Sequence, residues 1–345
     1  MKLEIKIGTR SSKLALWQAE YVRDELLKLG KHIDLPPLEI VLKEIKTKGD
    51  HITDVAISKI GGKGLFTKEI EDALLAGEID LAVHSLKDLP TKLPDGLKIG
   101  AVLKREKPHD VLLVRSRNYD MSFPGLTGES SLYNASGNIL DSRFCGNDKT
   151  MFANLSSGSK IGTSSLRRTA QLKALRNDLE YLDLRGNLDT RIRKLEEGQY
   201  DGIILAYAGV KRLGFEDKIT EHFNPKDILP AVGQGALAIE IREGDKDIED
   251  IISKLNHNET YLASMAERAF LETLQGGCQV PIGAYSEIEN NKITLYGVIA
   301  SLDGKRIIKD NVNCTLVKEN CLNLGKELGE KLLLNGGKEI LSIIR

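Results

Sequence analysis

The feature that most constrains the fold of this chain is an internal repeat. Lys6–Trp17 reads KIGTRSSKLALW and Lys160–Gln171 reads KIGTSSLRRTAQ, so both contain Gly-Thr followed by serine. In each, a short β-prone segment leads to a position suited to a helix N-cap. A second pair, Leu75–Ser85 and Glu196–Ala206, places a helix-ending glycine and then an aspartate before a strand of the buried type. The repetition predicts two similar doubly wound α/β domains, with ligands at the carboxyl ends of the strands.

The pattern changes after Asn256, where a smaller α+β domain is predicted. A helix with Leu262, Ala266 and Phe270 on one face precedes a glycine-rich turn. Two strands and a final helix are expected around Lys292–Ile299, Arg306–Val312 and Lys318–Leu334. PAVGQG, at Pro230–Gly235, is the expected hinge between the larger domains. The expected domains are therefore residues 1–104 with 233–253, residues 105–232, and residues 254–345.

The composition excludes several classes of protein. Lys and Arg total 49 against 50 for Asp and Glu, which disfavours a general nucleic-acid binder. The N-terminal MKLEIKIGTR lacks the apolar core of a signal peptide, and no apolar run approaches the roughly 18 residues of a membrane span. We therefore expect a cytoplasmic protein that does not enter a membrane. Because no CxxC pair or histidine cluster is present, we expect neither a disulfide scaffold nor a metal site from the cysteines, which are Cys145, Cys278, Cys314 and Cys321.

The segment Asp120–Ser159 does not fit the repeat. It is rich in Ser, Gly and Asn, lacks sustained periodicity, and separates a strand at Val111–Val114 from one at Ile161. A compact domain seldom needs a connection of this length. We interpret it as a surface insertion in the second domain, largely disordered, at about residues 120–159.

Arg167 and Arg168 lie in the first turn of the helix predicted in the second repeat. Free N–H groups and the helix dipole favour anions there. Since adjacent helical residues do not share a face, the two guanidiniums are expected to flank the helix tip and to suit two separated carboxylates. Thr163, Ser164 and Ser165 add hydroxyl donors. A helix start that merely faces solvent is the alternative.

Further charged residues follow other predicted strands. Arg10, Arg185 and Arg191 stand in strand-to-helix loops; each alone would be a surface charge, but together they would converge on one cleft. Lys87 and Asp88 follow a buried-type strand in HSLKDLP. Asp88 is either a turn or ion-pair residue or a carboxylate held opposite a cation that forms during a reaction.

Two loops contain several glycines. GGKGLF, at Gly61–Phe66, lacks the spacing of a phosphate-binding loop, so a flexible lid is the better interpretation. QGGCQVPIG, at Gln275–Gly283, places Cys278 in a tight loop. There the thiol is a candidate for covalent attachment or nucleophilic catalysis, with a buried apolar cysteine as the alternative.

Taken together, these motifs resemble the hydroxymethylbilane synthase (porphobilinogen deaminase) family. The resemblance covers nearly the whole chain except Asp120–Ser159, through GTRSSKLALWQA, SKIGGKGLF, DLAVHSLKDLP, IGTSSLRR, LRGNLDTR, LPAVGQGA and GGCQVPIG. It implies two domains of the periplasmic-binding-protein (type II) kind with the active cleft between them, and a third domain with the cofactor cysteine. It also implies a monomeric transferase of tetrapyrrole, porphyrin and heme biosynthesis. Four molecules of porphobilinogen are condensed with loss of ammonia on a dipyrromethane cofactor, and water then releases hydroxymethylbilane.

The resemblance implies roles for individual residues. Cys278 is the residue to which dipyrromethane is joined by a thioether, and Asp88 is the catalytic carboxylate that faces the pyrrole N–H and the developing positive charge. Further cofactor contacts are implied for Ser12, Lys87, Thr163, Ser164, Ser165, Arg167, Arg168 and Arg185. Substrate contacts are implied for Arg10, Lys59, Ser85 and Arg191.

Two other functions stay open from the sequence. A two-lobed protein that only binds a dicarboxylate would explain the arginines, but it gives no reason for a cysteine in an exposed loop. An acyl- or amido-transferring enzyme with Cys278 as nucleophile would need a paired histidine, and the sequence does not indicate one.

Overall fold

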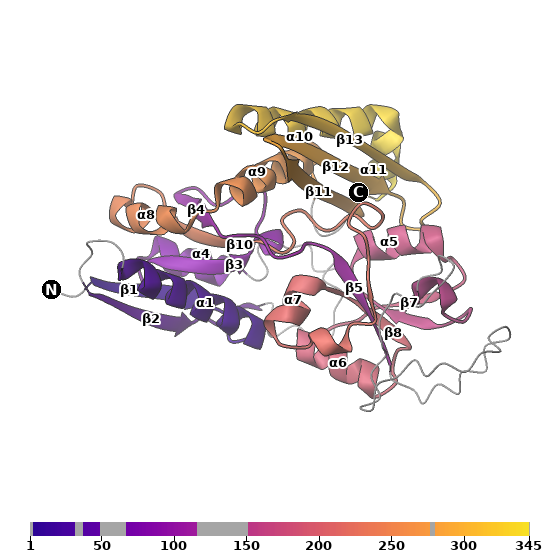
Figure 1. Ribbon diagram of the computed structural model, residues 1–345, viewed down its shortest axis with the longest axis horizontal. Helices are drawn as coiled ribbons and strands as arrows, with labels where there is room; N and C mark the ends of the chain where they lie inside the picture. Colours follow the sequence, from indigo (N-terminus) through magenta and orange to yellow (C-terminus); the bar gives the residue numbers. More distant parts are fainter. Residues whose placement is uncertain (1–2, 32–36, 49–66, 116–150, 277–279, 345) are drawn as a thin grey trace.

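The computed structural model describes residues 3–31, 37–48, 67–115, 151–276 and 280–344. Its strands form three sheets, two of five strands and one of three. In Figure 1 the first sheet is mainly indigo and purple, the second mainly pink, and the third lies above them in orange to yellow. None of the helices in the described ranges has the length and apolar character needed to cross a membrane.

The sheet of the first domain has the strand order β2-β1-β3-β10-β4. β1 runs parallel to β2 and β3, whereas β10 runs antiparallel to β3 and β4. The helix predicted in the first repeat is α1, which buries Ala19, Val22 and Leu26 in the core of this domain. The strands are β1 (Leu3–Thr9), β2 (Leu38–Glu44), β3 (Leu81–Ser85), β4 (Leu97–Val102) and β10 (Leu237–Arg242). The helices are α1 (Lys13–Gly30), α4 (Lys68–Leu75) and α8 (Lys246–Ile252).

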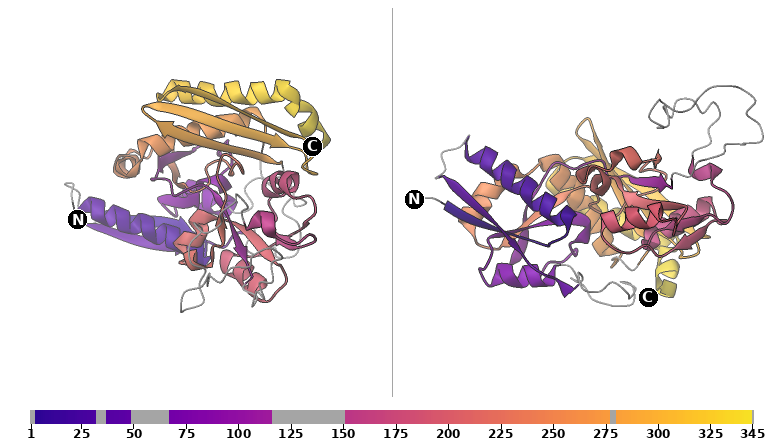
Figure 2. Two further views of the ribbon diagram at one scale, coloured as in Figure 1. Left: turned by 45° about the vertical axis from the view of Figure 1, so that its right-hand side comes forward. Right: turned by 90° about the horizontal axis from the view of Figure 1, so that it is seen from below.

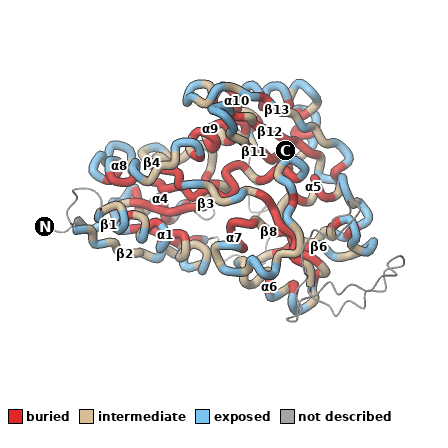
Figure 3. The backbone as a smooth tube through the Cα atoms, viewed as in Figure 1, coloured by how far each residue is buried: buried red, intermediate tan, exposed pale blue. Residues whose placement is uncertain are grey.

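The sheet of the second domain repeats this order as β7-β6-β8-β5-β9, with β5 in the place of β10. β6 is parallel to β7 and β8, and β5 is antiparallel to β8 and β9. The predicted pair of similar α/β domains is confirmed, and Figure 3 shows buried residues along the central strands β3 and β8. The strands are β5 (Asp110–Val114), β6 (Lys160–Gly162), β7 (Glu180–Leu182), β8 (Gly202–Ala206) and β9 (Glu221–His222). The helices are α5 (Leu166–Leu175), α6 (Leu188–Glu196) and α7 (Tyr207–Arg212).

Two connecting segments join these domains. The first, residues 103–109, runs from β4 of the first sheet to β5 of the second, and the second, residues 223–236, runs from β9 of the second sheet back to β10 of the first. The segments are hydrogen-bonded to each other: the N–H of Glu106 donates to the carbonyl oxygen of Gly235 at 3.2 Å. Gly235 has a φ of 92°, and a Cβ atom there would collide with the carbonyl oxygen of Glu106. The close approach of the two segments therefore requires glycine at the end of PAVGQG.

The third domain packs three helices and an antiparallel sheet, β11-β12-β13, around one core. Its predicted helix, the two predicted strands and the helix predicted at Lys318–Leu334 are confirmed. That helix is not the final one, because α11 follows it, and β11 is a further strand. Figure 2 shows the third domain lying across the other two: α9 contacts β4 of the first domain and β12 contacts α5 of the second. The strands are β11 (Ile282–Glu289), β12 (Lys292–Ala300) and β13 (Ile307–Thr315). The helices are α9 (Asn258–Thr273), α10 (Lys318–Leu332) and α11 (Lys338–Ile344).

The prediction of a largely disordered insertion at 120–159 is wrong at its C-terminal end. Phe152 is only 3% exposed and packs edge-to-face on Phe223, with 5.5 Å between the ring centroids. The guanidinium of Arg176 donates to the carbonyl oxygens of Phe152 and Ala153 at 3.0 and 2.8 Å. Residues 151–159 are therefore an ordered part of the second domain, anchored to its core by the buried side chain of Phe152. The rest of the predicted insertion, up to residue 150, lies outside the described residues and stays a prediction.

Candidate active site

Two of the predicted loops face each other where the first and second domains meet. One follows β3, where Ser85 ends the strand and a 3₁₀ turn, Leu86–Asp88, carries Lys87 and Asp88. The other is the start of α5, with Arg167 and Arg168 in its first turn. Asp88 and both arginines are among the charges that act on the ammonium group of Lys87. Groups from both domains therefore share one electrostatic environment.

The two repeated helices begin as predicted. The Oγ of Ser12 accepts a hydrogen bond from the N–H of Ala15 at 3.3 Å and caps α1. The Oγ of Ser165 accepts from the N–H of Arg168 at 3.4 Å and caps α5. Since each capping serine satisfies an N–H at the helix start, each fixes the direction in which its loop leaves the sheet.

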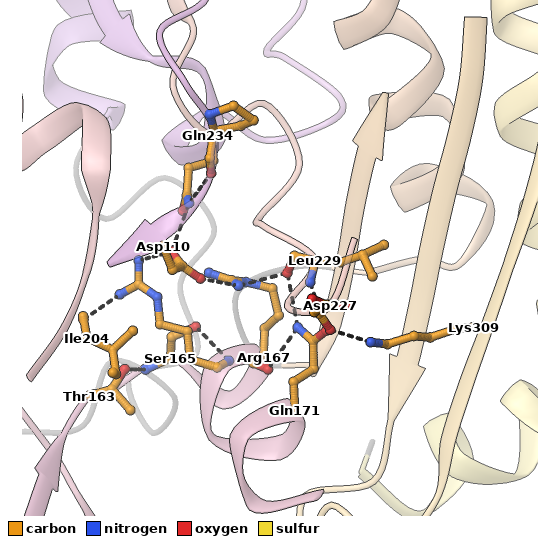
Figure 4. A network of polar contacts seen from close by, with 12 residues as sticks. Asp110, Thr163, Ser165, Arg167, Gln171, Ile204, Asp227, Leu229, Gln234 and Lys309 are labelled. Carbon is orange, nitrogen blue, oxygen red and sulfur yellow. Dashed lines mark hydrogen bonds and ion pairs between the residues drawn. The ribbon is translucent and has the colours of Figure 1, made fainter. Parts of the chain in front are cut away.

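Arg167 and Arg168 do not flank the helix tip but converge on one carboxylate, that of Asp110 at the start of β5. Nη1 of Arg167 lies 2.7 Å from Oδ2 of Asp110, and Nη2 of Arg168 lies 2.7 Å from Oδ1. Figure 4 shows this arrangement, in which Gln234 donates a third hydrogen bond to Oδ1 at 2.9 Å. Asp110 is fully buried, and the arginines are 5% and 6% exposed. The expectation from helical geometry was wrong because long side chains on neighbouring helical positions can bend toward one buried acceptor.

Several charged groups around Asp110 and the two arginines have shifted pKa values. Burial alone would raise the pKa of Asp110, but attraction to Arg167 and Arg168 outweighs it and holds the pKa well below its ordinary range. Burial lowers the pKa of Lys87, partly offset by Asp88. Burial, with Arg168 nearby, lowers the pKa of Arg191 to about 10. Asp110 is therefore a permanent anion that holds the two arginines in place.

Positive charge exceeds negative charge in this region. Arg191 and Lys87 add to the two arginines, and only Asp88 adds to Asp110 among the described carboxylates that act on them. The buried Nε atoms of Arg167 and Arg168 have no hydrogen-bond partner among the described residues. Buried donors with surplus positive charge suit a ligand that carries several carboxylates. The donor set at the domain junction therefore fits such a ligand.

The other predicted site residues within the described ranges lie around this region. Ser164 is exposed, and its hydroxyl donates to the carbonyl oxygen of Leu184 at 2.7 Å, next to Arg185. The hydroxyl of Thr163 accepts from the N–H of Ser165 at 3.3 Å. Ser85 accepts from the side-chain amide of Gln18 at 2.9 Å. Arg10, Ser12, Ser85 and Asp88 line a cavity of about 70 Å³ in the first domain.

Two predicted site residues, Lys59 and Cys278, lie outside the described residues, as does the predicted lid. Cys314 and Cys321, by contrast, lie in the third domain, Cys314 half-buried and Cys321 fully buried. Burial raises the pKa of both thiols. Their core positions make them poor nucleophiles.

Sequence reasoning missed the residues that hold the arginines. Asp110 opens the otherwise apolar strand DVLLV, and a carboxylate at the start of such a strand was the available signal. Gln171 was also missed: its side chain donates to the carbonyl oxygen of Leu229 at 3.0 Å and accepts from the N–H of Leu229 at 2.9 Å. These two hydrogen bonds tie α5 to the second connecting segment (Figure 4).

Comparison with known proteins identifies the family. Residues 5–250 match the model described as "Porphobilinogen deaminase, dipyromethane cofactor binding domain", and residues 261–334 match "Porphobilinogen deaminase, C-terminal domain". The porphobilinogen deaminase of Carboxydothermus hydrogenoformans is 49% identical over 345 residues, covering 100% of this chain and 98% of that one. That of Desulfitobacterium hafniense is 49% identical over 341 residues, covering 99% and 97%. A solved structure of an amino-acid ABC transporter extracellular-binding protein, ytmK of Bacillus subtilis, is 11% identical and covers 74% of this chain and 90% of that one, with a TM-score of 0.37.

Proposed function

This chain belongs to the porphobilinogen deaminase family, and we propose that its reaction takes place where Lys87 and Asp88 face the arginines of the second domain. The enzyme is a transferase of tetrapyrrole biosynthesis with a dipyrromethane cofactor. It joins four molecules of porphobilinogen head to tail with loss of ammonia, and hydrolysis then releases linear hydroxymethylbilane. The observation that carries the proposed location is the surplus of positive charge there, on the buried Arg167 and Arg168 and the half-buried Lys87 and Arg191.

The residues around the site would hold the cofactor by its carboxylates. Each pyrrole carries an acetate and a propionate, and each charge-assisted hydrogen bond contributes about 1.5–3 kcal/mol net. When bound, dipyrromethane supplies a covalently held pyrrole from which the product chain grows. Cys278 is the proposed attachment residue. The proposed non-covalent contacts are Ser12, Lys87, Thr163, Ser164, Ser165, Arg167, Arg168 and Arg185, with Arg10, Lys59, Ser85 and Arg191 toward the substrate.

Asp88 is the proposed catalytic carboxylate. It is exposed at the end of the 3₁₀ turn, so a substrate can reach it, and it acts electrostatically on both Lys87 and Arg191. Loss of ammonia from the aminomethyl group leaves a cation spread over the pyrrole ring. A carboxylate about 4 Å away stabilises a unit positive charge by about 4 kcal/mol at an effective dielectric constant near 20. That corresponds to roughly three decades of rate.

We also propose the domain boundaries, the cellular location and the oligomeric state of the protein. The order of strands in the sheets supports domains at 1–104 with 233–253, 105–232 and 254–345, since β10 lies in the first sheet and β5 in the second. We propose a cytoplasmic monomer with porphobilinogen as its small-molecule partner. Light scattering on the purified protein would measure the mass in solution, and a dimer mass would overturn the monomer.

The cofactor assignment is tested with two measurements on purified protein. An acidic aldehyde reagent should give the colour of a pyrrole, which neither a dicarboxylate-binding protein nor a cysteine acyltransferase would give. Intact-protein mass spectrometry should show two added pyrrole units in the wild type and none in Cys278→Ser. Cys145→Ser, Cys314→Ser and Cys321→Ala serve as matched controls and should retain the added mass. Two pyrrole units on Cys278→Ser would assign the attachment to another residue.

A further inference from the structure

Three ionisable side chains, Glu71, His84 and Glu240, meet inside the first domain close to the Asp88 turn. His84 is on β3 and Glu240 is on the adjacent antiparallel strand β10, where it pairs with Ala82, two residues before His84. Nε2 of His84 lies 3.1 Å from Oε2 of Glu240, and the two side chains are 6% and 0% exposed. Glu71 of α4 is 5% exposed and acts electrostatically on both.

The carboxylate of Glu240 has few partners in this cluster. No described residue completes a hydrogen bond to either of its oxygens, so the groups that act on it are the His84 imidazole, with Nε2 at 3.1 Å, and the charge of Arg268. Burial raises the pKa of Glu71, and the negative charge of Glu240 adds to that effect. Isolated buried carboxylates are costly. The close approach of the His84 imidazole therefore offsets part of the cost of burying the Glu240 carboxylate.

The imidazole of His84 is not sealed off from the active site. His84 lines the same cavity of about 70 Å³ as Arg10, Ser12, Ser85 and Asp88. That volume is enough for about two water molecules. The imidazole of His84 thus lies beside the buried carboxylate of Glu240. It also lines the cavity that contains Asp88, the exposed carboxylate proposed for catalysis. A carboxylate behind a histidine fixes the tautomer and orientation of the imidazole.

We propose that His84 accepts the proton that each condensation removes from a pyrrole ring carbon, with Glu240 as the positioning residue that keeps the second ring nitrogen free to accept it. The inference rests on the proposed function, in which one ring C–H bond is replaced by a C–C bond in every cycle. The C–H bond breaks, its electron pair restores the aromatic ring, and the proton passes through the cavity to His84. The ammonia released from the substrate takes up that proton and leaves as ammonium, so atoms and charge balance over the cycle.

The first test determines which ring nitrogen of His84 carries the proton and does not depend on enzyme activity. Nitrogen NMR of the holoprotein with ¹⁵N-labelled histidine should show that Nε2 of His84 carries a proton and that Nδ1 does not. Glu240→Gln should remove the strongly downfield Nε2–H signal that a charged acceptor produces. A wild-type His84 that carries its proton on Nδ1 would have no acceptor nitrogen toward the cavity, and that result overturns the proposal.

The second test measures porphobilinogen consumption with substrate deuterated at the free ring carbon. His84→Gln should lower kcat about 10²-fold with little change in KM and should show a larger primary isotope effect than the wild type. His257→Asn, which replaces a histidine that caps α9, is the matched control and should behave as the wild type. If His84→Gln does not fold, the same measurements on Glu240→Gln decide, with the same direction expected.

The outcomes separate this inference from the proposed function. A lower kcat without any increase in the isotope effect assigns His84 a purely structural role and overturns the inference alone. Normal turnover of His84→Gln does the same. A wild-type protein that carries no pyrrole and consumes no porphobilinogen overturns the proposed function itself.

Discussion

Arg105 and Glu267 form a bidentate ion pair between the first connecting segment and helix α9 of the third domain. Nη1 lies 2.6 Å from Oε1 and Nη2 lies 3.2 Å from Oε2. Glu267 is fully buried and also accepts the N–H of Gly233 at 2.8 Å and of Ser286 at 2.9 Å. One carboxylate therefore ties both connecting segments to the third domain, whose α9 ends at Thr273, five residues before Cys278 in the sequence.

Removing the charge of Glu267 should destabilise the whole protein. In Glu267→Gln the guanidinium of Arg105 would stay about 10% exposed without its partner. Breaking a buried pair in this way costs about 3–5 kcal/mol. Chemical denaturation should show that loss in the free energy of unfolding, whereas Glu25→Gln, in an exposed pair with Lys28, should show no measurable change. An unchanged denaturation midpoint for Glu267→Gln would mean that the pair does not hold the domains together.

Asp88→Asn should fold and keep its cofactor but lose turnover. The substitution removes the negative charge and preserves the shape, so the loss follows from electrostatics and should be on the order of 10³-fold. Initial rates of porphobilinogen consumption measure it, with the cofactor checked by mass. Asp95→Asn, at another exposed aspartate of the first domain, is the control. Near-normal turnover would remove Asp88 from the mechanism.

Asp110→Asn should weaken ligand binding more than it slows the chemistry. Without the carboxylate, Arg167 and Arg168 lose the acceptor that holds both guanidiniums, and their repulsion is no longer offset. We expect a raised KM for porphobilinogen and partial loss of bound pyrrole, with a smaller change in kcat. A large fall in kcat at unchanged KM and full cofactor content would contradict this account.

Stability should fall as the pH is lowered from about 6.5 toward 4, because of His109. Burial, with His222 and Lys107 adding to it, lowers the pKa of His109 from 6.5 to about 4. Between these values the unfolded chain binds more protons than the folded chain, so acid favours unfolding. The full loss is on the order of 3 kcal/mol. Denaturation midpoints at several pH values should show a shallower slope for His109→Gln, and an equal slope would exclude His109 as the cause.

Residues 120–148 should be removable, but residues 151–159 should not. Lengthening or shortening a surface loop changes the free energy of folding little. Phe152, by contrast, fills the core beside Phe223 and Leu172, and Phe152→Ala should cost about 3–5 kcal/mol. Activity and melting temperature of a 120–148 deletion should match the wild type. A deletion that melts much lower would show that the removed segment packs.

The elements that depend on local pattern could be predicted from the sequence. The helix with Ala19, Val22 and Leu26 on one face and the capping residues Ser12 and Ser165 need only near neighbours in the chain. The sequence repeat then predicted two similar domains, because the same local signals occur twice in the same order.

The features that depend on distant partners could not be predicted. Asp110 is 57 and 58 residues from the arginines that it holds, and Glu267 is 162 residues from Arg105. No periodicity connects such positions. Phe152 was assigned to a disordered segment because an anchoring aromatic in a Ser-rich stretch has no local signature. The exchange of β5 and β10 between the sheets is likewise a property of the complete fold.

That exchange has a consequence for the order of assembly during synthesis. A ribosome that has made the first 236 residues has made every strand of the second sheet, but the first sheet still lacks the strand that belongs between β3 and β4. The first domain is therefore incomplete at a stage of synthesis when all strands of the second sheet are already available. Translation delivers the first domain first, yet it is completed second.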